Sequence, residues 1–421
     1  MLLNITIENF RSYNEAQTLS LIASENNGVN SAKVGDLEVR KSAVIYGANA
    51  SGKSNIIKAG LALIDILTND IRLPEQFQRN SIYKPFFGST SPTKISVDFS
   101  VLENIYTYSL SYDDKRIYFE SLLDVNDNII FERSLGSQSN EYEYIIPETS
   151  WQILLNDEQL DIAESLFKQF KSTTSERRTF LRHLVENNCK KIEPILQSMR
   201  NVIIRLNPYG VIGKPLYAES DLHYAANYFR NTRQEQQAIS ALNHIGVNLQ
   251  RMNVTFNDND PLPGERPSEV RKITSSYALK DGVTCELDFL NDESDGTQKF
   301  YSYFALVDFI IKYDGVLVVD ELETHFHPLM VEEIIRAVHN SNSKAQLIFT
   351  THNPTFLTES IFERDQIYFA EKNDKLATEL YSLADFSDLK ADSNLMAKYL
   401  AGRFGAIPYL NAFTFNGVNN G

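Results

Sequence analysis

The first part of the chain predicts an isolated strand and then a strand, a loop and a helix. Apolar and polar residues alternate over residues 3–8, which is the period of a strand with one buried face. Residues 42–46 form a second apolar run that leads directly into a glycine-rich loop. Over residues 53–70 the apolar positions recur at helical spacing. A strand–loop–helix unit is therefore expected over residues 42–70.

The next segment predicts antiparallel strands. Residues 94–102, 105–112 and 116–123 are short runs rich in β-branched and aromatic residues. Asn residues or an Asp-Asp pair separate them, and these residue types favour tight turns. We expect an antiparallel meander.

The middle of the chain changes to a helical pattern. Apolar residues recur three and four positions apart over residues 158–170, 177–188 and 192–206. Three prolines within residues 255–270 then indicate a linker. Beyond it the patterns predict strands at 272–279, 283–290, 315–320 and 345–350, and helices at 296–312 and 328–340.

Strand and helix alternate at both ends of the chain, with a different pattern between them. This order predicts an α/β fold in which one domain is assembled from the two chain ends. Its parts are expected at residues 1–148 and 255–421, and a mainly helical insert is expected at residues 149–254.

The charge balance excludes a protein that coats nucleic acid with its whole surface. The chain has 40 Lys and Arg against 55 Asp and Glu, a net charge of −15. Residues 151–250 are close to neutral, so a local basic patch stays open as an alternative. Arg177, Arg178 and Arg182 could form one, although a solvated basic face beside neighbouring glutamates explains them equally well.

Cysteine usage and hydropathy indicate a cytoplasmic protein. Cys189 and Cys285 form no Cys-x-x-Cys motif and no dense framework, as is typical where thiols stay reduced. No apolar run approaches the roughly 18 residues of a membrane span. The first residues show no secretory signal pattern. We expect no membrane partner, and we expect Cys189 and Trp151 to be packed residues.

A complete G-x-x-x-x-G-K-S motif lies between the second predicted strand and its helix. Such a loop cradles phosphate oxygens with backbone N–H groups and a helix N-terminus. Lys53 is expected to reach the terminal phosphates and Ser54 to ligate Mg²⁺. ATP and Mg²⁺ are the expected cofactors. The residues assigned to nucleotide binding here are Gly47, Asn49, Ala50, Ser51, Gly52, Lys53, Ser54 and Asn55.

An acidic pair ends the apolar run at residues 315–320. An acid at the carboxyl end of a buried parallel strand near a phosphate loop can hold Mg²⁺. Asp320 is assigned that role, and Glu321 is assigned to polarise the attacking water as a general base. A surface acidic pair is the alternative.

Three further motifs resemble the ABC-type ATPase heads of the RecF, SMC and OLD families. They are Ser294-Asp295-Gly296-Thr297-Gln298, the acid segment Asp320-Glu321-Leu322-Glu323-Thr324-His325-Phe326-His327-Pro328, and Thr350-Thr351-His352-Asn353-Pro354. The resemblance implies a P-loop head with a mixed sheet and an antiparallel β lobe. It implies that Ser294 and Gly296 cap a nucleotide bound by a second subunit. It also implies that His352 senses the γ-phosphate.

Both chain ends extend this resemblance. Residues 7–13 are similar to the opening strand of RecF-like proteins, and residues 399–408 to the tail of stand-alone ATPases of bacterial anti-phage operons. The signature is Ser-Asp-Gly-Thr-Gln and differs from the transporter Leu-Ser-Gly-Gly-Gln. The glutamine that usually joins nucleotide to the antiparallel lobe is not identified, with Gln76 and Gln78 as candidates.

A histidine metal site is a weaker alternative. His325 and His327 lie two positions apart, but zinc needs further ligands and neither cysteine is near in sequence. His327-Pro328 is better explained as a turn that faces the partner subunit.

The resemblance implies an ATP-dependent homodimer or higher homo-oligomer that hydrolyses ATP between two heads. The leading hypothesis is that the chain is the sensor ATPase of an anti-phage system similar to PARIS. In this role it would control a separately encoded Toprim or RloB-like nuclease. Too few residues follow Pro354 for a Toprim domain in this chain. DNA or a phage-derived molecule is the expected trigger. The alternatives are a RecF-like DNA-repair ATPase, a transporter subunit and a module that binds nucleotide without hydrolysis.

Overall fold

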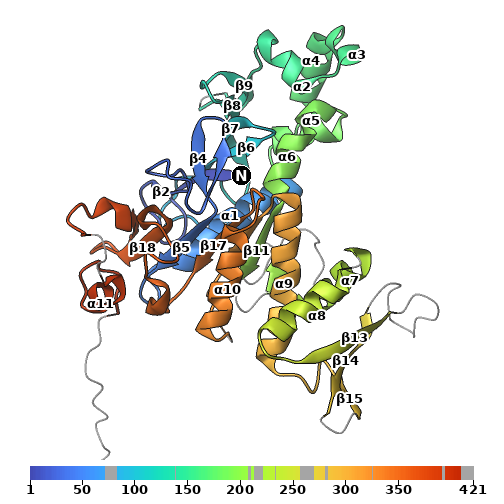
Figure 1. Ribbon diagram of the computed structural model, residues 1–421. Helices are drawn as coiled ribbons and strands as arrows, with labels where there is room; N and C mark the ends of the chain where they lie inside the picture. The colour runs from blue at the N-terminus through green and yellow to red at the C-terminus, as the bar shows by residue number, and fades with distance from the viewer. Residues whose placement is uncertain are drawn as a thin grey trace, which may run out of the picture.

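The computed structural model describes residues 1–71, 83–137, 139–206, 210–212, 221–232, 234–256, 270–279, 283–324, 326–390 and 394–408. Two seven-stranded sheets dominate it. In Figure 1 the central sheet occupies the middle, the antiparallel sheet and α2 to α6 lie above it, and a three-stranded sheet lies below.

The central sheet has the order β12-β11-β16-β17-β5-β18-β19. Its inner five strands run parallel, and the two edge strands are antiparallel to their neighbours. β5 comes from the N-terminal part of the chain and pairs with two C-terminal strands, which confirms one domain built from both chain ends. The strands are β5 (Ser42–Tyr46), β11 (Val202–Leu206), β12 (Gly210–Ile212), β16 (Val316–Val319), β17 (Gln346–Thr350), β18 (Ile367–Lys372) and β19 (Thr378–Ser382).

The second large sheet is antiparallel throughout, in the order β10-β9-β8-β7-β6-β1-β2. The predicted meander is confirmed, and the first strand of the chain extends it by lying between β6 and the edge strand β2. The strands are β1 (Leu2–Glu8), β2 (Gln17–Ser20), β6 (Thr93–Val101), β7 (Asn104–Tyr112), β8 (Ile117–Asp124), β9 (Ile129–Leu135) and β10 (Tyr142–Ile145), with a hairpin of β3 (Ser31–Val34) and β4 (Leu37–Arg40) beside them. The predicted α/β class with a mixed sheet and an antiparallel lobe is confirmed.

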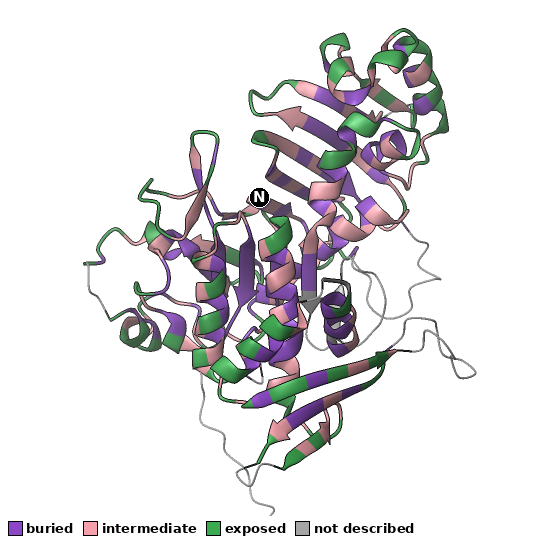
Figure 2. Ribbon diagram, turned by 45° about the vertical axis from the view of Figure 1, so that its right-hand side comes forward, coloured by how far each residue is buried: buried purple, intermediate pink, exposed green. Residues whose placement is uncertain are grey.

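Each face of the central sheet belongs to a different hydrophobic core. Val316 and Val318 face the core shared with α1 (Lys53–Thr68) and the antiparallel sheet. Leu317 and Val319 face the core shared with α9 (Asp295–Tyr313) and α10 (Pro328–His339). This alternation follows from the strand period of two, and it explains why the strands are continuously apolar. Figure 2 shows these strands as buried.

The remaining helices lie at the two ends of this arrangement. Upper helices are α2 (Trp151–Leu154), α3 (Asp157–Leu160), α4 (Ala163–Thr173), α5 (Phe180–Glu186) and α6 (Glu193–Arg200). Others are α7 (Asp221–Thr232), α8 (Glu235–His244) and α11 (Leu395–Leu400), with short 3-10 helices at Glu148–Ser150, Lys190–Ile192, Pro354–Phe356, Arg364–Gln366 and Leu383–Asp385. The three-stranded sheet is β13 (Leu249–Phe256), β14 (Val270–Ala278) and β15 (Thr284–Asp288).

One predicted helix is wrong in its second half. α6 ends at Arg200, and residues 202–206 form β11, which pairs in parallel with β16. The run Val-Ile-Ile-Arg-Leu is rich in β-branched residues, whose side chains pack better on a strand than on a helix. The segment 149–254 therefore supplies two strands of the central sheet, β11 and β12, as well as helices. Its boundaries stay a prediction, and most of the predicted linker, residues 257–269, lies outside the described residues.

Two of the three arginines considered for phosphate contacts form ion pairs, and the third, Arg177, donates to the carbonyl oxygen of Lys115 at 3.2 Å. Arg178 pairs with Asp70 at 2.9 Å and with Glu186 at 2.8 Å, and Arg182 pairs with the same two acids. Cys189 is fully buried, as expected. Within the part of the chain that the structure describes, no helix is long and apolar enough to cross a membrane.

A fully buried ion pair fixes the upper helices to the antiparallel sheet. Arg133 on β9 lies 3.1 Å from Glu120 on β8, and both side chains are 0 % exposed. Glu120 also accepts backbone N–H groups of Phe180 and Leu181 at the start of α5, at 2.6 and 2.9 Å. The Glu120 carboxylate is thus satisfied on several sides, which is the condition for a buried charge, whereas Arg133 Nε has no hydrogen-bond partner among the described residues.

We predict that Arg133→Met lowers the free energy of unfolding by about 3–5 kcal/mol, because Glu120 is left charged and buried without its partner. Lys94→Met is the matched control, since Lys94 pairs with Glu8 at 2.8 Å with side chains 57 % and 36 % exposed. Its cost should stay below about 1 kcal/mol. Urea denaturation of both variants measures this, and equal losses would contradict the assignment.

Candidate functional site

The glycine-rich loop between β5 and α1 is held in a shape that only glycine permits at two positions. Gly52 has φ of 111° and stands directly before the first residue of α1. A Cβ atom on Gly52 would lie 2.1 Å from Thr378 Oγ1, and one on Gly47 would lie 2.5 Å from the Ala370 carbonyl oxygen. The loop is therefore pressed against β18 and β19.

Two hydroxyl residues support this loop from behind. Thr378 Oγ1 lies 2.7 Å from both the Ser51 carbonyl oxygen and Ser12 Oγ. Asn55 Nδ2 donates to Ser12 Oγ at 2.8 Å. Sequence reasoning did not identify Ser12 or Thr378, because they are 366 positions apart and no local pattern marks either of them.

Lys53 lies across the mouth of the loop. Its Nζ donates to the carbonyl oxygens of Gly47 and Ala48 at 2.8 and 3.0 Å. Burial lowers the pKa of Lys53 to about 8, although the carboxylates of Asp320 and Glu321 act in the opposite direction. The ammonium is thus poorly solvated, so an anion at this point would be attracted strongly.

The loop also contains a polar atom with unused hydrogen-bonding capacity. Ser51 Oγ is buried and has no hydrogen-bond partner among the described residues. A buried hydroxyl without a partner is costly, and a phosphate oxygen would satisfy it. Together with the Lys53 ammonium at the start of α1, this donor set fits a nucleotide phosphate chain.

Asp320 brings three elements together at the edge of the central sheet. Its Oδ1 atom accepts hydrogen bonds from Ser54 Oγ at 2.8 Å and Thr350 Oγ1 at 2.7 Å. Asp320 is only 5 % exposed. A carboxylate beside hydroxyl oxygens is the donor type that Mg²⁺ prefers, so Ser54 and Asp320 fit the metal role expected of them. Thr350 was not identified from the sequence as a partner of Asp320.

Glu321 follows in an unusual backbone conformation. Its φ is 52°, a region that non-glycine residues enter only when their surroundings hold them there. The Glu321 N–H donates to Thr350 Oγ1 at 2.8 Å. Its Oε1 atom lies 3.8 Å from Nε2 of His352, so the structure brings the two predicted catalytic side chains together.

A second acid positions the histidine. Glu323 Oε1 accepts the backbone N–H of His352 at 2.7 Å, and the other carboxylate oxygen of Glu323 is buried without a partner in the described structure. The pKa of His352 is lowered, first by burial and then by the charge of Lys53. His352 is therefore neutral near pH 7 and can both donate and accept a proton.

The signature residues lie elsewhere, at the start of α9. Ser294 is exposed, and its Oγ caps the helix by accepting the N–H of Thr297 at 3.2 Å. Glu293 holds this turn by accepting hydrogen bonds from the hydroxyl groups of Ser275, at 2.7 Å, and Tyr277 on β14. Within the described residues, the hydrogen bonds of Ser294 stay inside this turn and do not reach the glycine-rich loop.

The remaining candidates contribute no further site. His325, Gln76 and Gln78 lie outside the described residues. His327 caps α10, where its Nδ1 accepts the N–H of Leu329 at 3.3 Å. No group of three or more His, Cys, Asp or Glu with metal-binding geometry occurs among the residues that the structure describes.

Comparison with known proteins gives a family match and distant relatives. Residues 42–358 match the family described as "AAA domain, putative AbiEii toxin, Type IV TA system". The Septu protein PtuA of Bacillus mycoides (strain KBAB4) is 26 % identical over 129 residues, and an uncharacterized protein of Dictyostelium discoideum is 25 % identical over 255 residues. These matches cover 29 % and 56 % of this chain but only 18 % and 32 % of the relatives.

Similar solved structures are SMC heads. A head bound to the C-terminal winged-helix domain of ScpA is 14 % identical, with a TM-score of 0.42, over 90 % of this chain and 97 % of that one. The SMC head domain from Thermotoga maritima is 12 % identical, with a TM-score of 0.41, over 90 % and 98 % of the two chains.

We predict that Gly52→Ala destabilises the protein more than an alanine substitution at another glycine that also has a positive φ but has free space around it. Gly246 is the control, because its φ is 90° and an added Cβ would meet nothing within 4 Å. Both variants carry the left-handed penalty of about 1–2 kcal/mol. Only Gly52→Ala also forces Thr378 and Ser12 to move, since the added Cβ would lie 2.1 Å from Thr378 Oγ1 and 2.7 Å from Ser12 Oγ. Denaturant unfolding should therefore show a larger loss for Gly52→Ala, and equal losses would contradict the tight contact.

Proposed function

The chain belongs to the family described as an AAA domain, putative AbiEii toxin, Type IV TA system, and from that premise we propose that it is an Mg²⁺-dependent ATPase that acts as a molecular switch. One observation carries the proposal. Asp320, Ser54 and Thr350 share a hydrogen-bonded cluster directly below the glycine-rich loop, with Lys53 buried in the same place. These three residues and Lys53 come from the end of β16, the start of α1 and the end of β17, and no single sequence motif contains all four.

Each residue has a role that its position supports. The loop N–H groups and Lys53 bind the phosphates of ATP, and the free hydroxyl of Ser51 accepts or donates one further hydrogen bond. Ser54 and Asp320 hold Mg²⁺, which when bound neutralises charge on the phosphate oxygens. The remaining loop residues assigned to ATP are Gly47, Asn49, Ala50, Gly52 and Asn55.

Glu321 and His352 are the proposed proton-transfer pair. The Glu321 carboxylate accepts the proton of the attacking water. His352 is 36 % exposed at its side chain and neutral, so it can donate a hydrogen bond to a terminal phosphate oxygen. The Thr350 hydroxyl fixes the backbone of Glu321, and Glu323 fixes the backbone of His352.

The exposed signature supports a site shared between two copies of the chain. Ser294 caps α9 and Gly296 lies in its first turn, at a helix N-terminus that can face an anion. A second copy placed head to head would bring this turn over the glycine-rich loop of the first. The proposed active state is accordingly a homodimer, or a higher oligomer built from it.

The partner class is a separately encoded effector. The family description names a Type IV TA system, and the named bacterial relative is a Septu protein, which supports a role in a multi-component defence system. A Toprim or RloB-like nuclease is the proposed effector, and DNA or a phage-derived molecule is the proposed trigger. Two free cysteines support a cytoplasmic location. A RecF-like role on DNA is less well supported, because Arg178 and Arg182 are paired with acids.

We predict Mg²⁺-dependent release of phosphate from ATP by the purified chain. Lys53→Ala should abolish tight nucleotide binding, because the ammonium that faces the phosphates is removed. Glu321→Gln should keep binding and reduce turnover by roughly 10² or more, the scale of a lost general base. Phosphate release and a fluorescent ATP analogue measure the two effects.

Glu323→Gln is the matched control for Glu321→Gln. A glutamine at position 323 still accepts the N–H of His352 through its Oε1 atom, so turnover should fall by less than about tenfold. Equal turnover in the wild type and Glu321→Gln would remove Glu321 from the mechanism. A larger loss in Glu323→Gln than in Glu321→Gln would transfer the role of base to Glu323.

We predict that two inactive variants restore activity when mixed. Lys53→Ala damages the loop of one chain, and Gly296→Asp places a negative side chain on the signature of the other. A heterodimer then retains one intact composite site, so about half of the wild-type activity should return in purified heterodimers. No recovery in verified heterodimers would contradict a shared site.

We predict that effector binding depends on the nucleotide state, because a switch can act on a partner only through different affinities for its two states. Pull-downs from the host with ATP-bound Glu321→Gln and with nucleotide-free protein should differ in at least one co-purified protein. Mg²⁺-dependent cleavage of DNA or RNA by the chain alone, lost on changing acids other than Asp320 and Glu321, would overturn the proposal.

A further inference from the structure

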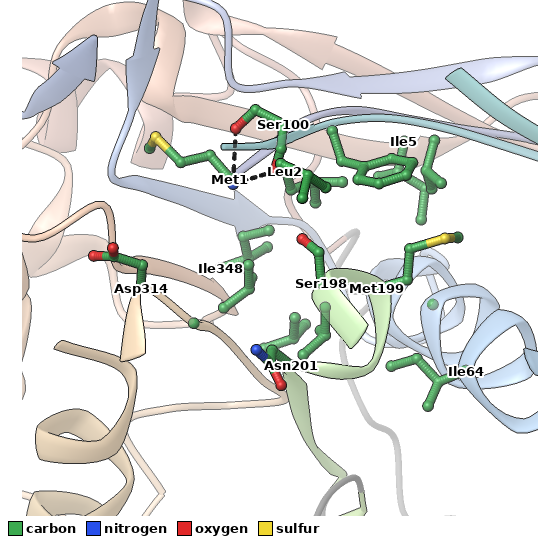
Figure 3. Close-up of a pocket in the computed structure, with 18 of the residues that line it drawn as sticks. Met1, Leu2, Ile5, Ile64, Ser100, Ser198, Met199, Asn201, Asp314 and Ile348 are labelled. Atoms are coloured by element: carbon green, nitrogen blue, oxygen red, sulfur yellow. Dashed lines mark hydrogen bonds between the residues drawn. The ribbon is translucent and has the colours of Figure 1, made fainter. Parts of the chain in front are cut away.

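A large apolar cavity lies between the two main sheets. Its volume is about 540 Å³, and it is lined by β1, β6, α1, α6, β11, β16 and β17 (Figure 3). The wall consists mainly of aliphatic and aromatic side chains such as Ile57, Phe99, Ile204, Val318 and Ile348. This size is within the usual range of small-molecule sites, roughly 300–1,000 Å³, and is far larger than ordinary packing defects.

Polar groups also line the cavity. Glu103 and Asp314 contribute two carboxylates, and Lys344 contributes one ammonium, which pairs with Glu103. Asp314 also accepts the backbone N–H of Lys344 at 2.7 Å. Ser198 and Asn201 add a hydroxyl and an amide, and Figure 3 shows them beside Ile348. The N-terminal amino group of Met1 also lines the cavity and donates to Ser100 Oγ at 3.0 Å, and burial lowers its pKa to about 6, so it is mostly uncharged near pH 7. The lining therefore offers hydrogen-bond acceptors and carries more negative than positive charge.

A glycine in the middle of α1 enlarges this cavity. Gly60 lies within the helix Lys53–Thr68, where glycine is less stable than alanine. Close packing does not require it, because a Cβ atom at position 60 would meet only Ile204 Cδ1, at an ordinary 3.5 Å. The helix thus carries an unfavourable residue whose structural effect is to leave space next to the cavity.

We propose that this cavity binds a small molecule with an apolar body and an uncharged, hydrogen-bond-donating head group. The apolar body would fill the space beside Gly60. The head group would donate to the polar acceptors of the lining, and a carboxylate there would be repelled by Glu103 and Asp314. The proposal goes beyond the ATPase function and does not depend on it.

The experiment is calorimetric titration of the full chain with octan-1-ol and with octanoate, which have the same apolar body and different head groups. Octan-1-ol should bind with one site per chain and a dissociation constant below about 1 mM. Octanoate should bind at least tenfold more weakly. If octan-1-ol does not bind, the cavity stays dry and empty, as some engineered apolar cavities do, and the proposal is overturned. Equal binding of octanoate would overturn the assigned head group.

Variants at position 60 locate the bound molecule. Gly60→Met places a flexible apolar side chain in the cavity and should weaken octan-1-ol binding at least tenfold without lowering the thermal midpoint. Gly60→Ala, the matched control, adds one methyl group and should keep binding within about threefold. If Gly60→Met does not fold, Ile348→Phe fills the same cavity from β17. Unchanged binding in a folded filling variant would place the ligand elsewhere and overturn the proposal.

Discussion

The hydrogen bonds to the Asp320 carboxylate are the interaction on which the site depends. They join residues at the carboxyl ends of three strands that come from distant parts of the chain. Asp320 follows β16, Ser54 lies in the helix after β5, and Thr350 ends β17. This meeting requires the parallel register in which Val319 lies beside Phe349, and Phe349 beside Val44. A shift of one residue in any of these pairings would turn the side chains to the opposite face and remove the cluster.

Three residues around this cluster have a left-handed backbone conformation. Ala50, Gly52 and Glu321 all have positive φ, and two of them are not glycine. Such conformations persist only when neighbours hold them, and here the neighbours are Thr378 behind the loop and Thr350 beside Glu321. The loop and the acid are therefore pre-shaped before any ligand arrives, which reduces the ordering cost of binding.

The parts of the site whose residues are close together in the sequence could be predicted from the sequence. Residues 47–54 combine a motif with its strand and helix, and Asp320 ends an apolar strand, so their positions could be predicted. Ser12, Thr350 and Thr378 could not, because each acts through a partner that only the folded chain brings near. The strand β11 was misassigned for a related reason. An amphipathic helix precedes it directly, and only pairing with β16 decides between helix and strand.

Strand β16 contacts the cavity and leads directly into the proposed catalytic site. Val316 and Val318 line the cavity, Leu317 and Val319 pack against the helices on the other face, and Asp320 follows immediately. α1 has the same double role, since it begins at Lys53 and contributes Gly60 to the cavity. Tightly packed elements respond to a new contact by small shifts of the whole element rather than by local compression. A ligand in the cavity that moves β16 or α1 can change the affinity of the site for nucleotide. Linkage then requires nucleotide to change the affinity of the cavity for that ligand by the same factor.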